Sequence, residues 1–167
     1  MFLDSTFLVD FLRGKQKSLF FMEANESAPL FTSEINVFEL IDGIYYGDEK
    51  IAQRLEKVFG LLARITVLPF DRKAALKAGE ISGKLTRDGE KIGELDCLIA
   101  GVAISNGIFD FVTDNEEHYQ KIKELNVILK ADVQGSLEAL CDSLAKIPSD
   151  QVKLKFIHMG IGDINLS

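Results

Sequence analysis

The sequence has few residues that could form a disulfide or zinc framework. Its 167 residues include only two cysteines, Cys97 and Cys141, which lie far apart in apolar segments. We expect both to be buried, reduced thiols, because their spacing fits neither a zinc site nor a disulfide framework. The sequence also has no run of about twenty apolar residues, the length that spans a bilayer. No basic leader precedes an apolar run at the start, so we expect a cytoplasmic protein with no membrane partner.

Positive charge is scarce as well. The chain has 19 Lys and Arg residues against 26 Asp and Glu, which gives a formal net charge of −7. Proteins that coat nucleic acid neutralise phosphates with a basic surface, so this balance argues against a non-specific nucleic-acid binder. An acidic enzyme that holds phosphates through metal ions is still compatible with the charge.

The chain does contain an alternation of strand-like and helix-like segments, which is typical of a parallel α/β sheet. We predict strands at 1–3, 30–32, 65–68, 108–113 and 127–129, with helices between them, including an amphipathic helix at 116–125. A helix at 136–147 and a strand at 152–157 are predicted to follow. The predicted fold class is α/β: a doubly wound parallel sheet with helices on both faces, extended by a C-terminal strand–helix–strand unit.

Four acidic residues occupy positions where a carboxylate is hard to explain as solvated surface. Asp4 and Asp114 each follow a predicted strand, Glu39 lies among apolar helix residues, and Asp96 is the only charge in residues 95–104. Burying an unpaired carboxylate costs about several kcal/mol. Such a group is therefore paired with a cation, protonated or bound to a metal ion. Strand ends of a doubly wound sheet meet at one edge, so the four acids are predicted to converge there. Oxygen ligands of this kind favour Mg²⁺ or Mn²⁺.

Each acid also has an ordinary structural interpretation. Asp4 and Asp114 could cap the helices that follow them. Glu39 and Asp96 could form tertiary salt bridges instead of binding metal. The combination of all four favours a metal site over these separate explanations.

Five short segments together resemble the PIN-domain family, in particular the VapC-like toxins of prokaryotic toxin–antitoxin pairs. The segments follow the family's order and cover about residues 1–128. They are Phe2-Leu3-Asp4-Ser5-Thr6 with Phe11-Leu12-Arg13-Gly14, Ser33 through Glu39-Leu40 with Gly43, Val67-Leu68-Pro69-Phe70-Asp71 with Ala78-Gly79, Asp96-Cys97-Leu98-Ile99-Ala100, and Phe111-Val112-Thr113-Asp114-Asn115. Each motif alone is weak, but five in sequence are specific.

The resemblance implies a metal-dependent endoribonuclease in which Asp4, Glu39 and Asp96 are metal ligands. The family's last acidic or amide position falls two residues after the strand-end threonine, which here is Asn115, whereas Asp114 follows Thr113 directly. We keep both as candidates and favour Asp114 for its charge. The implied partners are an RNA substrate, a protein antitoxin and a second copy in a homodimer.

The end of the chain resembles a different family. Residues 127–140 and 152–162 are similar to the first part of the third domain of bacterial translation initiation factor two. The factor's GTP-binding region is absent, since the chain has no Gly-rich phosphate loop ending in Gly-Lys-Ser or Gly-Lys-Thr. We therefore predict a nuclease domain at 1–125 and an initiation-factor-like segment at 126–167 that packs on the same sheet.

Three functions follow from these patterns. A ribonuclease toxin is the first hypothesis. A catalytically silent PIN-like binding module is the second, and a translation-associated interaction protein is the third.

Overall fold

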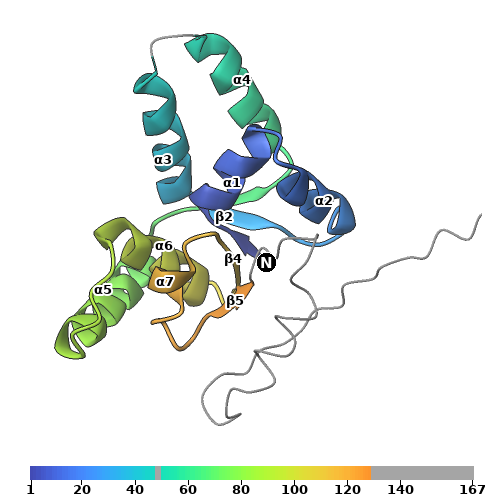
Figure 1. Ribbon diagram of the computed structural model, residues 1–167. Coiled ribbons are helices and arrows are strands. Elements are labelled where there is room, and N and C mark those ends of the chain that lie inside the picture. Colours follow the sequence, from blue (N-terminus) through green and yellow to red (C-terminus); the bar gives the residue numbers. More distant parts are fainter. Residues whose placement is uncertain (48–49, 129–167) are drawn as a thin grey trace, which may run out of the picture.

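Five parallel strands form the centre of the computed structural model, which describes residues 1–47 and 50–128 (Figure 1). The strands are β1 (Phe2–Leu3), β2 (Phe31–Ser33), β3 (Thr66–Leu68), β4 (Asp110–Val112) and β5 (Asn126–Ile128). Their order is β3-β2-β1-β4-β5, and every neighbouring pair is parallel. The chain therefore begins in the middle of the sheet and builds outward on both sides, which confirms the predicted α/β fold.

The sheet is buried on both faces because successive side chains of a strand point to opposite sides. In β1, Phe2 packs into one apolar core and Leu3 packs into the other. The neighbouring strand β4 repeats this division with Phe111 and Val112. Phe2 and Phe111 stack with their ring centroids 5.0 Å apart. Two cores on a single sheet are the reason that the central strand β1 is apolar on both of its faces.

Helices cover each face in a separate layer (Figure 1). The core that contains Leu3 includes residues of α1 (Ser5–Leu12), α2 (Gln16–Ala24), α3 (Glu34–Tyr45) and α4 (Ile51–Leu62). The core that contains Phe2 includes residues of α5 (Arg72–Arg87), α6 (Glu94–Ser105) and α7 (Glu116–Tyr119). The predicted helices on both faces are thus present.

Helices α5 and α6 approach each other closely at Gly101. A Cβ atom at this position would lie 2.7 Å from the Ala74 carbonyl oxygen and 2.7 Å from the Ala78 Cβ. Two small residues on α5 and a glycine on α6 therefore let the helix backbones touch. This contact packs α6, the helix that carries Asp96, against α5.

The predicted helix at 116–125 is wrong in its second half. Only Glu116–Tyr119 is helical, and the chain then turns through hydrogen bonds from Ile122 N–H to Tyr119 and from Leu125 N–H to Ile122. Ile122 and Leu125 are still buried in the core. Their apolar spacing suits a helix and a turn equally, and the turn is what brings the chain back to pair β5 with β4.

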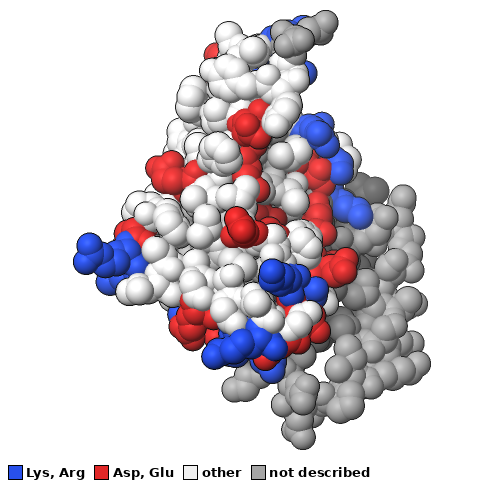
Figure 2. All heavy atoms as spheres, turned by 90° about the vertical axis from the view of Figure 1, so that its left-hand side faces the viewer, with Lys and Arg blue, Asp and Glu red and all other residues white. Residues whose placement is uncertain are grey.

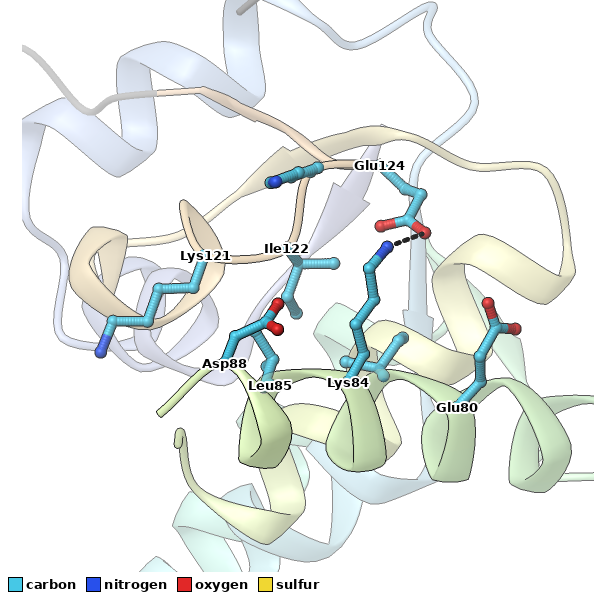
Figure 3. Close-up of a pocket in the computed structure, with 9 residues that line it drawn as sticks. Glu80, Lys84, Leu85, Asp88, Lys121, Ile122 and Glu124 are labelled. Carbon is cyan, nitrogen blue, oxygen red and sulfur yellow. Dashed lines mark ion pairs between the residues drawn. The ribbon is translucent and has the colours of Figure 1, made fainter. Parts of the chain in front are cut away.

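Two ion pairs join the turn after α7 to α5 and to the loop that follows α5. Lys84 lies 4.0 Å from Glu124, and Lys121 lies 3.6 Å from Glu90. Figure 3 shows Lys84 reaching from α5 toward Glu124 beside a small hollow of about 20 Å³. This hollow is about large enough for one water molecule, and none of the four predicted site acids lines it.

Other sequence predictions have mixed outcomes. Cys97 is buried and free, as expected. The strand predicted at 127–129 is present as β5, which is half-buried along its length and lies at the end of the described sheet. The predicted helix at 136–147, the strand at 152–157 and Cys141 lie outside the described residues. No described helix is long and apolar enough to cross a bilayer.

The role of β5 in the sheet can be tested with two truncations. A chain ending at Leu125 loses β5 and exposes β4, whereas a chain ending at Ile128 keeps it. We expect the shorter chain to melt at least about 5 °C below the longer one, because Val127 leaves the core, and to aggregate through its open edge. Thermal denaturation and gel filtration measure both effects. Equal melting temperatures for the two truncations and the full chain would make residues from 126 onward an independent appendage.

Candidate active site

The candidate site lies at the carboxyl ends of the central strands. Asp4 follows β1, Ser33 ends β2 and opens α3, and Thr113 follows β4. Because these strands are parallel neighbours, their ends meet at the same edge of the sheet. Ligand sites of doubly wound sheets form in this place.

Asp4 is the most buried of the predicted acids, with only 2% of its surface exposed. One carboxylate oxygen accepts hydrogen bonds from the Thr113 hydroxyl at 2.7 Å and the Thr6 hydroxyl at 2.9 Å. The other accepts from the Asn36 amide at 3.2 Å and the Tyr119 hydroxyl at 3.3 Å. Asp4 occupies the N-cap position of α1, but its side chain makes no capping hydrogen bond. The cap interpretation of Asp4 is therefore wrong.

Burial raises the pKa of Asp4, and the nearby charge of Asp96 raises it further. The hydrogen bonds from Thr113 and Thr6 lower this pKa in part. The donors around Asp4 thus favour its ionised form without supplying a positive charge. Such a balance is typical of a carboxylate that a functional site keeps buried.

Asp96 is joined to Asp4 through Tyr119. The hydroxyl of Tyr119 lies 3.1 Å from an Asp96 oxygen and 3.3 Å from an Asp4 oxygen. Burial, followed by the charges of Asp4 and Asp96, raises the pKa of Tyr119 well above its ordinary value. Tyr119 therefore stays protonated and donates its single hydrogen to one of the two acids.

The second oxygen of Asp96 lies 2.6 Å from Nδ1 of His118. The Asn115 side-chain amide lies 3.0 Å from the same ring nitrogen. Gly93, just before α6, leaves room for this arrangement, because a Cβ there would come within 2.8 Å of Asp96. Asp96 and Asn115 are thus linked through one histidine.

Glu39 approaches from α3 on the other side of the site. Burial raises its pKa, a hydrogen bond from Ser5 lowers it in part, and the charges of Asp4 and Asp96 raise it again. Its Oε2 atom is buried and has no hydrogen-bond partner among the described residues. This orphaned oxygen is free to serve as a ligand. The described residues give Glu39 no salt bridge either, so that alternative finds no support.

The adjacent residues Asp114 and Asn115 have different neighbours at the carboxyl ends of the strands. Asp114 is exposed, and it lines a pocket together with Glu39. Its negative charge, after burial, raises the pKa of the neighbouring Glu116. Asn115, not Asp114, occupies the N-cap position of α7, so Asp114 does not cap that helix. Asp114 therefore shares a pocket with Glu39, while Asn115 contacts His118, which contacts Asp96.

Four residues of this network were not among the predicted site residues: Asn36, Thr113, His118 and Tyr119. Asn36 closes a capping box with Ser33 at the start of α3, and its spare amide hydrogen reaches Asp4. The capping pattern at 33–36 was visible in the sequence, but the contact with Asp4 was not. His118 and Tyr119 were assigned to an amphipathic helix, and nothing local distinguishes them from its other members.

Comparison with known proteins agrees with this geometry. Residues 1–125, three quarters of the chain, match the family described as PIN domain. The chain belongs to the PIN-domain family. The PIN-domain resemblance that the sequence predicted is therefore confirmed.

Solved structures of similar fold come from toxin–antitoxin complexes. The DNA-bound VapBC of Salmonella typhimurium is 28% identical with a TM-score of 0.71, and the alignment covers 78% of this chain and 97% of that one. VapBC2 of Rickettsia felis, bound to a promoter DNA fragment, is 25% identical with a TM-score of 0.70. That alignment covers 76% of this chain and 96% of the other. The PIN fold of this chain is therefore nearly as extensive as theirs.

A second family, translation-initiation factor 2, matches residues 110–167. Translation initiation factor IF-2 of Rickettsia typhi is 57% identical over 47 residues, and that of Acetivibrio thermocellus is 59% identical over 44 residues. The first alignment covers 28% of this chain and 6% of the factor; the second covers 26% and 4%. The chain thus spans only a small fraction of these curated relatives, and both predicted resemblances are confirmed.

The residues of this PIN site suit a divalent cation in chemistry. Asp4, Glu39 and Asp96 offer only oxygen atoms, which match the preferences of Mg²⁺ and Mn²⁺. The unpartnered Oε2 of Glu39 and the mutual repulsion of the three acids are what a cation would relieve. Within the described part of the chain, no group of three or more His, Cys, Asp or Glu side chains is arranged closely enough to hold a metal ion. The ligand set is therefore still a prediction.

The raised pKa of Glu39 predicts that the stability of the folded protein depends on pH. A raised pKa means that the folded state binds the proton more tightly than the unfolded chain does, so stability falls as pH rises. In chelator at pH 8, Glu39→Gln should melt at or above the wild type. The difference should shrink as the pH falls toward 4.5, the ordinary carboxyl value. Thermal melts over this range measure it.

Asp42→Asn serves as the control, since it removes the same charge from an exposed position of α3. Its melting temperature should follow that of the wild type at each pH. A Glu39→Gln protein that melts many degrees lower at every pH would show that Glu39 makes a structural ion pair.

Proposed function

We propose that this PIN domain is a divalent-metal-dependent endoribonuclease and the toxin of a toxin–antitoxin pair. The proposal rests on the group formed by Asp4, Asp96 and Glu39 at the strand ends. Hydroxyl and amide donors surround these acids. No described cation pairs with Asp4 or Glu39. The proposed ligands are Asp4, Glu39 and Asp96, completed by Asp114 or Asn115. Mg²⁺ and Mn²⁺ are the proposed cofactors.

The reaction is hydrolysis of an RNA phosphodiester bond. These residues would hold a divalent cation, which would supply positive charge for the attacked phosphate and lower the pKa of a bound water. Thr6 and Thr113 hold the Asp4 carboxylate in one orientation and favour its ionised form. Ser5 holds Glu39 by a hydrogen bond that lowers its pKa. These side chains are fixed before substrate arrives, so little reorganisation is needed during the reaction.

His118 and Tyr119 act as positioning residues for Asp96. Together they contact both of its oxygens, at 2.6 Å and 3.1 Å, and so set the plane of the carboxylate. Partners of this kind orient a ligand residue without touching the metal or substrate themselves. Asn115 extends the same chain of contacts.

The proposed partners follow from the similar structures. Those structures are VapBC complexes, which supports a protein antitoxin for this chain. A homodimer, an RNA substrate and a cytoplasmic location are further parts of the proposal. The proposed domains are the nuclease at 1–125 and the initiation-factor-like segment at 126–167.

The first test is cleavage of total RNA in Mg²⁺ or Mn²⁺. Asp4→Asn should reduce the rate by roughly 100-fold or more, because metal-ion catalysis contributes several kcal/mol and each 1.4 kcal/mol is about tenfold. Asp42→Asn is the matched control and should cleave at the wild-type rate. A wild-type protein that folds but shows no metal-dependent cleavage would favour the catalytically silent binding module instead.

The second test concerns His118. Replacing it with alanine removes the contact to Asp96 and should weaken Mn²⁺ binding by about 10–100-fold in calorimetry. Glu117→Ala, a change at the exposed neighbouring position, should leave the Mn²⁺ affinity unchanged. Equal Mn²⁺ affinities for His118→Ala and the wild type would contradict the positioning role.

A further inference from the structure

Strand β5 leaves one edge of the sheet open. Within the described part of the chain it pairs with β4 only, in the parallel register that sets Val127 opposite Phe111. The backbone N–H of Asn126 donates to the Phe109 carbonyl at 2.7 Å, so it points toward β4. Successive N–H groups of a strand point to opposite sides of it. The N–H of Val127 therefore points toward the open edge.

Neither charge nor proline protects this edge. Strand β5 consists of Asn126, Val127 and Ile128, whereas β3, at the other end of the sheet, has the exposed Thr66 and is followed by Pro69, which has no N–H. Charged side chains are abundant elsewhere, and Figure 2 shows acidic and basic groups in several clusters on one face. Natural sheets protect an edge with charge, with proline or with a covering segment. We therefore expect a segment to cover β5.

The side chains of β5 are covered on one flank only. Phe111 and Val112, their neighbours on β4, are 0% and 2% exposed, whereas Val127 and Ile128 are half-buried. Val127 packs against the core on the face of α5, α6 and α7, and Ile128 packs against the core on the face of α1 to α4. Both cores therefore end at β5 with an apolar side chain that is incompletely buried.

The sequence that follows β5 has the pattern of a crossover connection and a strand. Residues 136–147 have an apolar helical stripe formed by Leu137, Leu140, Cys141 and Leu144. Residues 152–157 alternate lysine with apolar residues, which is typical of an edge strand. A parallel strand needs a connection of about a dozen residues or more, and residues 129–151 exceed that length. The initiation-factor match places these segments and β5 in one range, residues 110–167.

The topology of the described sheet decides on which face the connection runs. The connections from β3 to β4 and from β4 to β5 both lead toward this edge. Their helices α5, α6 and α7 contribute to the same core, on the face of Val127. Crossovers between parallel strands are almost always right-handed. A further connection in the same direction therefore places its helix on the face of Val127 as well.

We propose that residues 152–157 of the same chain pair with the open edge of β5 as a sixth parallel strand, and that residues 136–147 cross over Val127 as a helix. Strand β5 is then both the last strand of the PIN sheet and the first strand of the initiation-factor-like unit. The alternating lysines of residues 152–157 give the new edge the charged protection that β5 lacks. This interface goes beyond the proposed nuclease function and does not depend on it.

Hydrogen exchange of the Val127 amide in the full-length chain, followed by NMR, tests the pairing. We expect this amide to exchange at least about 100-fold more slowly than in an unstructured peptide, because it donates to the sixth strand. Leu154→Pro disrupts that strand at its centre and should speed the exchange by at least about tenfold. Asn165→Pro, which lies beyond the strand, is the matched control and should leave it unchanged. The Val112 amide of the interior strand β4 is the internal reference.

Nuclear Overhauser contacts between methyl groups test the face on which the helix lies. The methyl groups of Val127 should contact leucine methyl groups of residues 136–147, and those of Ile128 should not. Contacts from Ile128 instead would place the helix on the opposite face and contradict the right-handed crossover.

Fast exchange of the Val127 amide in the wild-type chain, beside a protected Val112 amide, would overturn the pairing even where Leu154→Pro fails to fold. Protection of Val127 that survives Leu154→Pro would overturn it too, and loss of that protection on dilution would identify a second copy as the partner of β5. None of these measurements involves RNA cleavage, so failure of this interface and failure of the proposed function are distinguishable.

Discussion

A buried carboxylate at the end of the central strand organises this molecule. Asp4 receives hydrogen bonds from Thr6 on α1, Asn36 on α3, Thr113 after β4 and Tyr119 on α7. Each donor comes from a different element, so the elements must be in place before the charge of Asp4 is satisfied. The site and the fold are for this reason parts of one network, and a change at Asp4 affects both.

This network accommodates negative charge without neutralising it. Hydroxyl and amide groups reduce the cost of burying Asp4, but burial and the charge of Asp96 raise its pKa. Burial and the charges of Asp4 and Asp96 raise the pKa of Glu39 in the same way. The two apolar cores on either side of the sheet must offset that cost. Proteins retain such arrangements where function requires them, because the acids alone make the folded state less stable. A bound cation removes the conflict, and this is the physical argument for metal binding.

The sequence predicted the strands and the helical layers, because both depend on local patterns of apolar residues, and it offered the acids as candidates on similar grounds. Asp96 is recognisable as a single charge in an apolar helix, and Asp4 as a charge at a strand end. Tyr119 and His118 could not be identified in this way, since their roles depend on the parallel pairing of β1 with β4 across more than a hundred residues. The helix predicted at 116–125 failed for a related reason: the pairing of β5 with β4 requires a turn that apolar periodicity does not reveal.

The two family matches overlap at residues 110–125, directly before β5 at the end of the described sheet. The PIN match ends at residue 125, just before β5, while the initiation-factor match begins at residue 110 and includes both β4 and β5. Within the described residues β5 pairs with one strand only, and it supplies Val127 to one core and Ile128 to the other. A strand in that position has to provide little more than two alternating apolar side chains and a backbone in register. Because all the candidate site acids precede it, such a strand can have the sequence of a different family without altering the chemistry at the centre of the sheet.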